Sequence, residues 1–196
     1  MTESNAQHGE QQQEHGTKEE FRSLIRLYRA GGHVYRLHTV PTLLNETVAQ
    51  HTFGVMSILR ALYHPAWPPN RLLVRALDHD MPEQYTGDMP APIKWKSDVI
   101  DEALKDIEAD WWDEAGIVPS PLRVEEYYIL KAADMLDLIL KCNEELNMGN
   151  KNRLGMYKTS DIISNGITYI SGLDLPEWVR EKVDYVIQML TWQEID

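Results

Sequence analysis

The sequence predicts an all-α protein, a compact bundle of six or seven helices in one domain. From Lys18 onward, apolar residues recur at the three- and four-residue spacing of amphipathic helices. Proline, glycine and helix-capping residues divide the chain into segments of helical length. No alternating apolar and polar run is long enough to indicate a strand of useful length. These three observations together favour helices packed on helices.

The first two predicted helices are bounded by clear start and stop signals. The first carries its apolar residues over positions 21–27 and ends at Gly31-Gly32. A non-helical stretch broken by Pro41 follows. The second helix begins near Thr47, because Thr47 and Gln50 have the spacing of a capping box.

Proline and capping signals also delimit the rest of the chain. A third helix follows Pro68-Pro69, with Asn70 as its predicted N-cap, and runs through the segment RLLVRALDHD. The next segment, MPEQYTGDMPAPIKW, carries three prolines and a glycine and is expected to be irregular. Helical patterns then resume over residues 97–114, 122–146, 160–170 and 177–193.

Composition restricts the class of protein. Residues 1–17 are almost entirely polar and predict a mobile tail, which leaves residues 18–196 as the folded domain. The net charge of −12 disfavours nucleic-acid polymers and membrane surfaces as partners. No membrane-spanning run or secretory signal is evident, and the single cysteine, Cys142, excludes an intrachain disulfide. We therefore expect a cytoplasmic protein.

Two segments in the N-terminal half carry side chains that suit a metal ion. His51 shares a helical face with apolar residues, where a histidine is more often a hydrogen-bonded core residue than a ligand. His79 and Asp80 are adjacent at the end of the third helix, and Glu83 lies four residues after His79. A helix terminus with solvated charges explains this second group equally well. Imidazole and carboxylate together, however, suit divalent transition metals.

Asp134 supplies the third segment. It lies in a strongly apolar helix between Leu130 and Leu138, where an unpaired carboxylate would cost several kcal/mol. The carboxylate is thus expected to bind a cation or to pair with a lysine. Lys131 and Lys141 share its face, so a half-buried salt bridge is as good an explanation as a metal site.

In combination these residues give the order H…HD…D, which resembles the HD superfamily of metal-dependent phosphohydrolases. The resemblance extends to Arg36, fifteen residues before His51, and to the segment HDMPEQYTGDMPAPIK, which is similar to an HDxxE…TGDxPxPxK block. The helix LKAADMLDLILKCNEELNMGN resembles the one that supplies the last ligand. The similarity covers about residues 20–150, and the nearest families are the YfbR-like 5′-deoxynucleotidases and the phage DatZ-type dATP triphosphohydrolases.

The resemblance implies roles for individual residues and an HD-domain helical fold. One divalent ion (Co, Mn, Zn or Mg) would be held by four ligands, with a second ion able to accompany the substrate phosphates. Glu83 and Asp88 would be catalytic residues. Substrate-binding positions and metal ligands complete the predicted site: Arg36, Leu37, Lys94 and Lys131 for the substrate, and His51, His79, Asp80 and Asp134 for the metal.

Two positions depart from the family pattern. Leu37 replaces the aromatic residue that usually follows the arginine, and Gln50 replaces the glutamate that usually precedes the first metal histidine. The metal set is unaffected, whereas Leu37 leaves the contact with the base or sugar open.

The substrate expected from the sequence is a small deoxynucleotide. The compact interval from His79 to Asp134 and the HTVPT segment resemble the phage enzymes, and several lysines suit a triphosphate. We therefore expect a dATP triphosphohydrolase that releases deoxynucleoside and triphosphate, with a 5′-deoxynucleotidase for monophosphates as the alternative. A helical regulator with an unused HD site is the non-enzymatic alternative. The resemblance also implies a homo-oligomer, a dimer or a hexamer, and the Trp111-Trp112 pair is a candidate for packing in the core or at a subunit interface.

Overall fold

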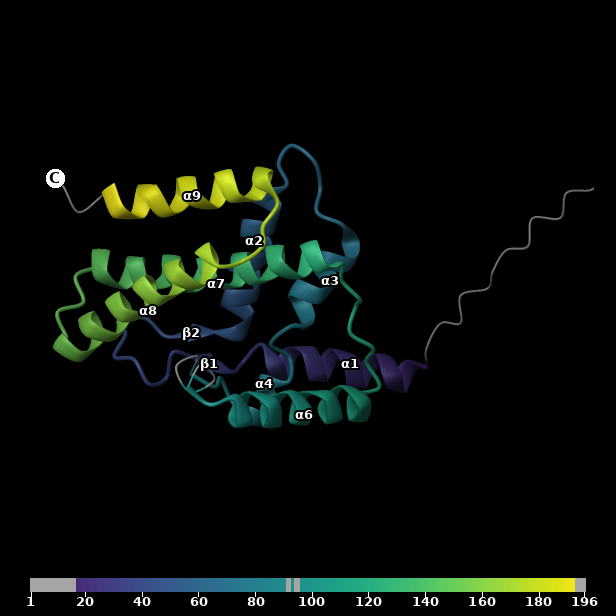
Figure 1. Ribbon diagram of the computed structural model, residues 1–196. Helices are drawn as coiled ribbons and strands as arrows, with labels where there is room; N and C mark the ends of the chain where they lie inside the picture. Colours follow the sequence, from purple (N-terminus) through teal and green to yellow (C-terminus); the bar gives the residue numbers. More distant parts are fainter. Residues whose placement is uncertain (1–16, 91–92, 94–95, 193–196) are drawn as a thin grey trace, which may run out of the picture.

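The computed structural model describes residues 17–90, 93 and 96–192, and confirms the all-α fold class. Seven helices of nine residues or more and the single-turn α4 make up most of this part of the chain (Figure 1). Their bounds are α1 Lys18–Gly31, α2 Val48–Leu62, α3 Asn70–Asp78, α4 Glu83–Thr86, α6 Asp98–Ala115, α7 Val124–Asn147, α8 Arg153–Ser171 and α9 Glu177–Trp192. None of these helices is both long and apolar enough to cross a membrane.

Helix α7 lies at the centre of the bundle and contacts α2, α3, α8 and α9 (Figure 1). It is buried on most of its circumference, because apolar residues occupy nearly every position of its middle turns. A helix that is apolar all round is typical of a core position. The core around α7 includes the fully buried residues Val55, Leu59, Leu72, Ile129, Leu136, Ile139, Ile170, Val179 and Val183.

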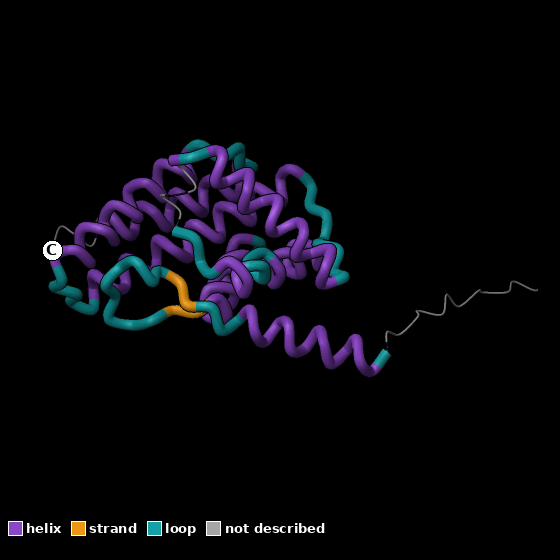
Figure 2. The backbone as a smooth tube through the Cα atoms, turned by 90° about the horizontal axis from the view of Figure 1, so that it is seen from below, coloured by secondary structure: helices purple, strands orange, loops and turns teal. Residues whose placement is uncertain are grey.

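A short antiparallel ladder joins β1, Tyr35–Arg36, to β2, Glu46–Thr47 (Figure 2). Its register pairs Tyr35 with Thr47 and Arg36 with Glu46. The sequence did not predict these strands, because two residues are too few to show a period of two. The ladder closes the base of the loop 37–45 and brings Arg36 next to the start of α2.

Most predicted helix signals are confirmed. Thr47 and Gln50 form the capping box at the start of α2, and α1 ends at Gly31. Thr17, assigned to the tail, is the N-cap of α1. The remainder of the predicted tail, residues 1–16, lies outside the described residues.

Three details of the predicted helices were wrong. Pro69, not Asn70, is the N-cap of α3, and no side chain caps this helix. Leu77 does not lie on the apolar face expected of an amphipathic helix: it is 44% exposed, because the buried face of α3 runs through Leu72, Ala76 and Asp78. Helix α8 begins at Arg153, seven residues before the predicted start, since the Asn152 side chain caps it.

Candidate metal centre and active site

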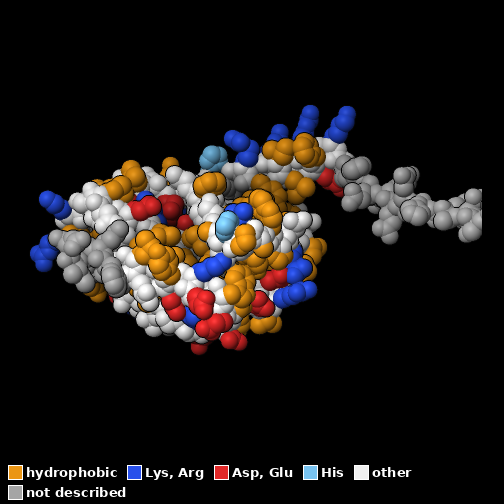
Figure 3. Space-filling view, turned by 90° about the horizontal axis from the view of Figure 1, so that it is seen from above, with side chains coloured by type: hydrophobic (Ala, Val, Ile, Leu, Met, Phe, Trp, Pro, Cys, Tyr) orange, Lys and Arg blue, Asp and Glu red, His pale blue; other side chains and the backbone are white. Residues whose placement is uncertain are grey.

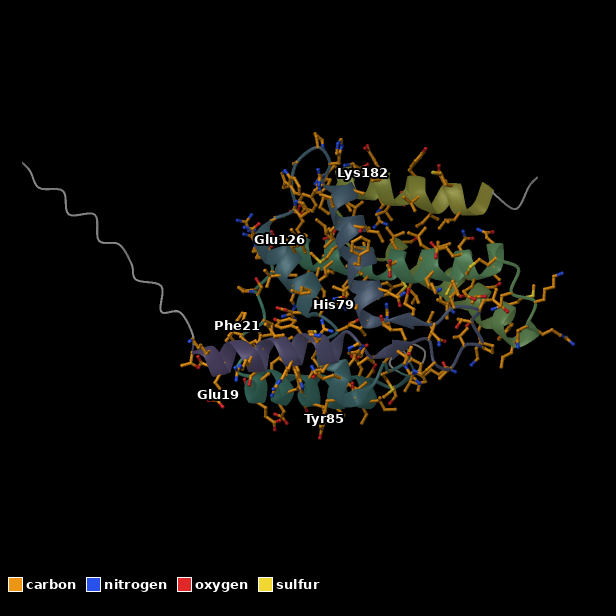
Figure 4. The ribbon with its side chains drawn as sticks, turned by 180° about the vertical axis from the view of Figure 1, so that it is seen from behind. Glu19, Phe21, His79, Tyr85, Glu126 and Lys182 are labelled. Atoms are coloured by element: carbon orange, nitrogen blue, oxygen red, sulfur yellow. The ribbon has the colours of Figure 1, made fainter. Side chains whose placement is uncertain are left out.

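Three helical segments bring the predicted metal ligands together inside the bundle. His51 comes from the first turn of α2, His79 and Asp80 immediately follow α3, and Asp134 comes from the middle of α7. The Nε2 atoms of His51 and His79 are 3.3 Å apart. His51 Nε2 lies 3.4 Å from Asp80 Oδ2 and 3.2 Å from Asp134 Oδ1. Figure 4 labels His79, which lies between the layer of α1 and α6 and that of α7.

Both imidazoles are oriented by hydrogen bonds on the side away from this cluster. His51 Nδ1 lies 2.7 Å from Asp137 Oδ2, and His79 Nδ1 lies 2.7 Å from the carbonyl oxygen of Ala76. Each Nδ1 is therefore the donor, which leaves each Nε2 atom directed toward the cluster. A carboxylate or carbonyl behind a histidine is the usual arrangement around a metal-ligating imidazole.

Asp137 was not identified from the sequence. It lies one turn after Asp134 on α7, so its spacing of three residues from a proposed ligand was the available signal. Its position depends on Gly54 of α2, because a Cβ atom at Gly54 would lie 1.8 Å from Asp137 Oδ1. The absence of a side chain at Gly54 thus provides the space in which Asp137 reaches His51.

The charges in the cluster stabilise one another. Burial and the charge of Arg36 oppose protonation of His51, yet hydrogen bonds to Asp134 and Asp137 outweigh them and raise its pKa to about 9. Burial favours the protonated form of Asp134, but the hydrogen bond from His51 and nearby positive charges hold its pKa well below the usual range. The pKa of Asp80 is likewise lowered, against the effect of burial, by positive neighbours.

This donor set fits a divalent cation. One ligand atom each from His51, His79 and Asp134 lie within 4.8 Å of one another. Two imidazole nitrogens with carboxylate oxygens are ligands that Zn²⁺, Mn²⁺ and Co²⁺ accept. The raised pKa of His51 lets its imidazolium charge compensate the buried carboxylates, and a bound cation would supply that positive charge instead.

A cavity of about 460 Å³ opens beside the cluster and contains most of the predicted substrate-binding residues. Arg36 is the most deeply placed cation in its wall, with a side chain that is 10% exposed. Its Nε and Nη1 atoms are buried and make no hydrogen bond within the protein. Buried guanidinium donors without partners are costly and are matched by an anionic ligand.

Asp88 and Leu37 are connected by the backbone. Leu37 has a φ of 55°, in the left-handed region of backbone conformation that residues other than glycine rarely adopt. Its amide N–H donates to Asp88 Oδ2 at 2.9 Å. Both residues line the cavity. Asp88 therefore fixes the strained residue that follows Arg36, a contact that the sequence did not predict.

Of the remaining predicted residues that the structure describes, some line the cavity and others do not. Glu83, the first residue of α4, lines the cavity and acts electrostatically on Arg36. Lys131 also lines it, with Nζ 3.8 Å from Asp134 Oδ2, so the salt bridge weighed from the sequence is present beside the cluster. Lys141 instead pairs with Glu145. Lys94 lies outside the described residues.

Helix α8 forms a wall of the cavity that sequence reasoning missed, because residues after 150 carried no recognisable motif. Tyr157, Lys158 and Asp161 lie in this wall. Lys158 Nζ also donates to the carbonyl oxygen of Thr39, which ties α8 to the loop 37–45. The Trp111-Trp112 pair lies elsewhere, on α6, as an edge-to-face contact with 4.8 Å between ring centroids.

Two histidines and two aspartates from three helical segments, next to a cavity with a buried arginine, define an HD-domain metal-dependent phosphohydrolase. Comparison with known proteins gives the family. The chain belongs to the 5′-deoxynucleotidase YfbR-like family, whose model matches residues 32–171. This assignment favours the enzyme over a regulator with an unused HD site.

Curated relatives and solved structures agree with this assignment. A 5′-deoxynucleotidase of Photobacterium profundum is 30% identical over 138 residues, 60% of this chain and 71% of its own length. The 5′-deoxynucleotidase YfbR of Salmonella paratyphi B is 32% identical over 135 residues, 58% of this chain and 67% of its own length.

Among solved structures, the cyanophage S-2L HD phosphohydrolase DatZ, bound to dA and one catalytic Zn²⁺ ion, has a TM-score of 0.67 at 19% identity, over 84% of this chain and 94% of its own. An HD-domain phosphohydrolase from Listeria innocua has a TM-score of 0.64 at 21% identity, over 86% of each chain. At these identities the two structures establish a common fold.

Proposed function

We propose that this protein is a 5′-deoxynucleotidase that hydrolyses the bond between the 5′ oxygen and the phosphorus of a deoxynucleoside monophosphate. The observation that carries the proposal is Arg36, whose buried Nε and Nη1 make no hydrogen bond in the wall of a cavity beside the His-Asp cluster. Membership of the YfbR-like family and the names of the curated relatives support this substrate class.

In the proposed site, the metal ligands are His51, His79, Asp80 and Asp134. A divalent ion held there would activate water as a nucleophile and polarise the phosphoryl group. The protein keeps both Nε2 atoms available for it through the hydrogen bonds to Asp137 and Ala76. Zn²⁺, Mn²⁺, Co²⁺ and Mg²⁺ are the candidates, and the DatZ structure provides the precedent for zinc.

The other residues of the proposed site bind the phosphate, protonate the leaving group or hold another residue in position. Arg36 binds non-bridging phosphate oxygens, and Lys131 adds a second positive charge beside Asp134. Glu83 is the candidate acid that protonates the leaving 5′ oxygen or orients water. Asp88 holds Leu37, and with it the direction of Arg36, through the amide hydrogen bond.

The charge of the cavity favours a monophosphate over a triphosphate. Its described lining contains five carboxylates, Asp80, Glu83, Asp88, Asp134 and Asp161, against three cations, Arg36, Lys131 and Lys158. One divalent ion would bring this set to neutrality. A monophosphate with two negative charges is then easier to accommodate than a triphosphate with up to four. The order of the two candidates is therefore the reverse of the one expected from the sequence.

A deoxynucleoside triphosphatase is the second candidate, and dATP is its leading substrate. Lys158 favours it, because this lysine adds a third cation to the cavity wall, and a triphosphate carries more negative charge than a monophosphate. A second cation carried by the phosphates would also ease the charge balance. Both candidates break the same 5′ phosphorus–oxygen bond and release the same deoxynucleoside.

The test is product analysis after incubation with Mn²⁺, Co²⁺, Zn²⁺ or Mg²⁺ and panels of deoxynucleoside mono- and triphosphates. We expect deoxynucleoside and orthophosphate from the monophosphates. Deoxynucleoside and triphosphate would favour the second candidate. No turnover of any nucleotide with any of the metals would contradict both, and Asp134→Ala serves as the inactive reference.

A further inference from the structure

Glu46 lies directly opposite Arg36 in the β1–β2 ladder. Glu46 is 8% exposed, and its Oε2 atom is 3.7 Å from Arg36 Nη1. This distance permits an ion pair but exceeds that of a hydrogen bond. The two side chains are therefore electrostatic partners, while the guanidinium keeps Nε and Nη1 available for another acceptor.

Glu46 also lies close to His51, one of the proposed metal ligands, and to Asp137. One ligand atom each from Glu46, His51 and Asp137 lie within 4.8 Å of one another. This second group is less suited to an ion than the first, because Asp137 already accepts from His51 Nδ1 and a guanidinium stands beside Glu46. The three residues instead link the arginine to the metal-facing histidine.

Four carboxylates compensate the buried charge of Arg36, namely those of Asp80, Asp134, Glu83 and Glu46. Two of them, Asp80 and Asp134, belong to the proposed metal ligands. When a cation occupies that site, it takes up their charge. Glu46 and Glu83 then balance Arg36, and only Glu46 approaches it from the strand opposite, on the ladder that also fixes the backbone of Arg36.

We infer that Glu46 is a positioning residue that holds the Arg36 guanidinium in the orientation that receives the substrate phosphate. The inference rests on the proposed function, since Arg36 is the phosphate-binding residue there. Glu46 does not touch the reacting atoms. It acts through Arg36, so its effect should vanish when Arg36 is absent.

The test is a double-mutant cycle of Glu46→Gln and Arg36→Ala on the metal-loaded enzyme. Glu46→Gln should raise KM for the nucleotide about tenfold and lower kcat less. In the Arg36→Ala background, Glu46→Gln should change neither constant by more than about twofold. Bound metal per chain, measured by elemental analysis, should stay as in the wild type.

Glu126→Gln is the matched control, because Glu126 is also buried and pairs with an arginine, with 2.7 Å between Arg71 Nε and its Oε2. Unlike Arg36, Arg71 is not part of the cavity wall. Glu126→Gln should lower thermal stability and leave KM unchanged. Glu46→Asp, with a shorter reach to the guanidinium, should give a KM between those of Glu46→Gln and the wild type.

Three results would overturn the inference. Additive effects in the cycle would show that Glu46 acts independently of Arg36. A lower KM in Glu46→Gln would show that Glu46 competes with the phosphate, and a loss of bound metal would make Glu46 part of an ion site. If the wild type turns over no nucleotide, the proposed function fails. In that case the affinity of the same four variants for inorganic phosphate is measured by titration. The inference is rejected if no variant binds phosphate, or if the effects of Glu46→Gln and Arg36→Ala on phosphate affinity are additive.

Discussion

Asp137 contacts His51 on the side away from the cavity and is expected to set how strongly that histidine binds a cation. Its carboxylate makes the imidazole a better electron-pair donor to a metal ion and holds Nε2 toward the cluster. Asp137→Asn keeps the shape and removes the charge. We expect metal affinity to fall about 10- to 100-fold, measured by competition with a chromogenic chelator.

Asp110→Asn, at an exposed position of α6, is the control and should bind metal like the wild type. Unchanged affinity in Asp137→Asn would mean that the hydrogen bond to His51 matters only for packing.

The raised pKa of His51 also predicts how the stability of the metal-free protein depends on pH. Its pKa is raised to about 9 in the folded state, from about 6.5 when unfolded. A raised pKa contributes stability that is complete below pH 6.5 and is lost as the pH rises through 9. Urea unfolding in the presence of a chelator should therefore show a free energy of unfolding that decreases from pH 6.5 to 9. His51→Gln should show a smaller decrease, and an equal one would contradict the assignment.

Metal binding should follow the opposite trend over the same range, because the cation and the proton compete for Nε2 of His51. We expect the affinity of Zn²⁺ or Mn²⁺ to rise with pH until about 9. Equilibrium dialysis at three pH values measures it, and an affinity independent of pH would argue against His51 as a ligand.

The C-terminal end of α7 anchors the loop 37–45. Glu145 is fully buried and accepts hydrogen bonds from the amides of Leu43 and Leu44, at 2.6 and 3.1 Å. Asn150, just after the helix, donates to the carbonyl oxygen of Pro41 at 2.8 Å. The loop carries part of the cavity wall, so α7 supplies a proposed metal ligand at its middle and a loop anchor at its end.

Glu145→Ala should therefore affect both folding and substrate binding. It leaves the amides of Leu43 and Leu44 and the ammonium group of Lys141 without their buried acceptor, which we expect to cost about 3 kcal/mol in the free energy of unfolding. KM should rise while metal content stays constant. Chemical denaturation and steady-state kinetics measure the two effects, and wild-type values for both would show that the loop holds its conformation without this anchor.

The sequence predicted the elements better than their contacts. Periodicity and capping residues located the helices, and motif spacing located His51, His79, Asp80 and Asp134, which the structure brings together. Asp137 was missed because its spacing of three residues from Asp134 does not show that it contacts His51, which comes from a different helix. Glu46 was missed for the same reason, since only the ladder places it opposite Arg36.

The start of α8 illustrates a different limit. Gly155 lies inside α8, at a position where a Cβ atom would come to 2.5 Å from the carbonyl oxygen of Pro41. Close approach of a distant loop, rather than a turn, requires this glycine. Local patterns cannot reveal such a requirement.

The whole molecule exposes an apolar and basic surface on α1, which projects from the bundle (Figure 2). Phe21 and Ile25 are 65% and 45% exposed, and Arg22, Arg26 and Arg29 are exposed beside them. Figure 3 shows Lys and Arg side chains along the outer edge of this segment, next to hydrophobic ones. Burial of the exposed apolar side chains would stabilise this helix, so we expect the homo-oligomer predicted from the sequence to form through this surface.

We therefore predict that the protein self-associates through α1. The double substitution Phe21→Glu and Ile25→Glu should reduce the mass measured by light scattering to that of a single chain. Val118→Glu, at a residue that is 90% exposed after α6, should leave it unchanged. A monomeric wild type would exclude the assembly.

The loop 37–45 is held at both of its ends and at several points between them. The β1–β2 ladder closes its two ends, and contacts from Glu145, Asn150 and Lys158 fix its tip and sides. We therefore expect the side chains of this segment to be replaceable at constant length while Arg36 and His51 keep their places on either side. Under the proposed function, laboratory evolution confined to this stretch is expected to change which nucleoside enters the cavity while the residues of the metal site stay the same.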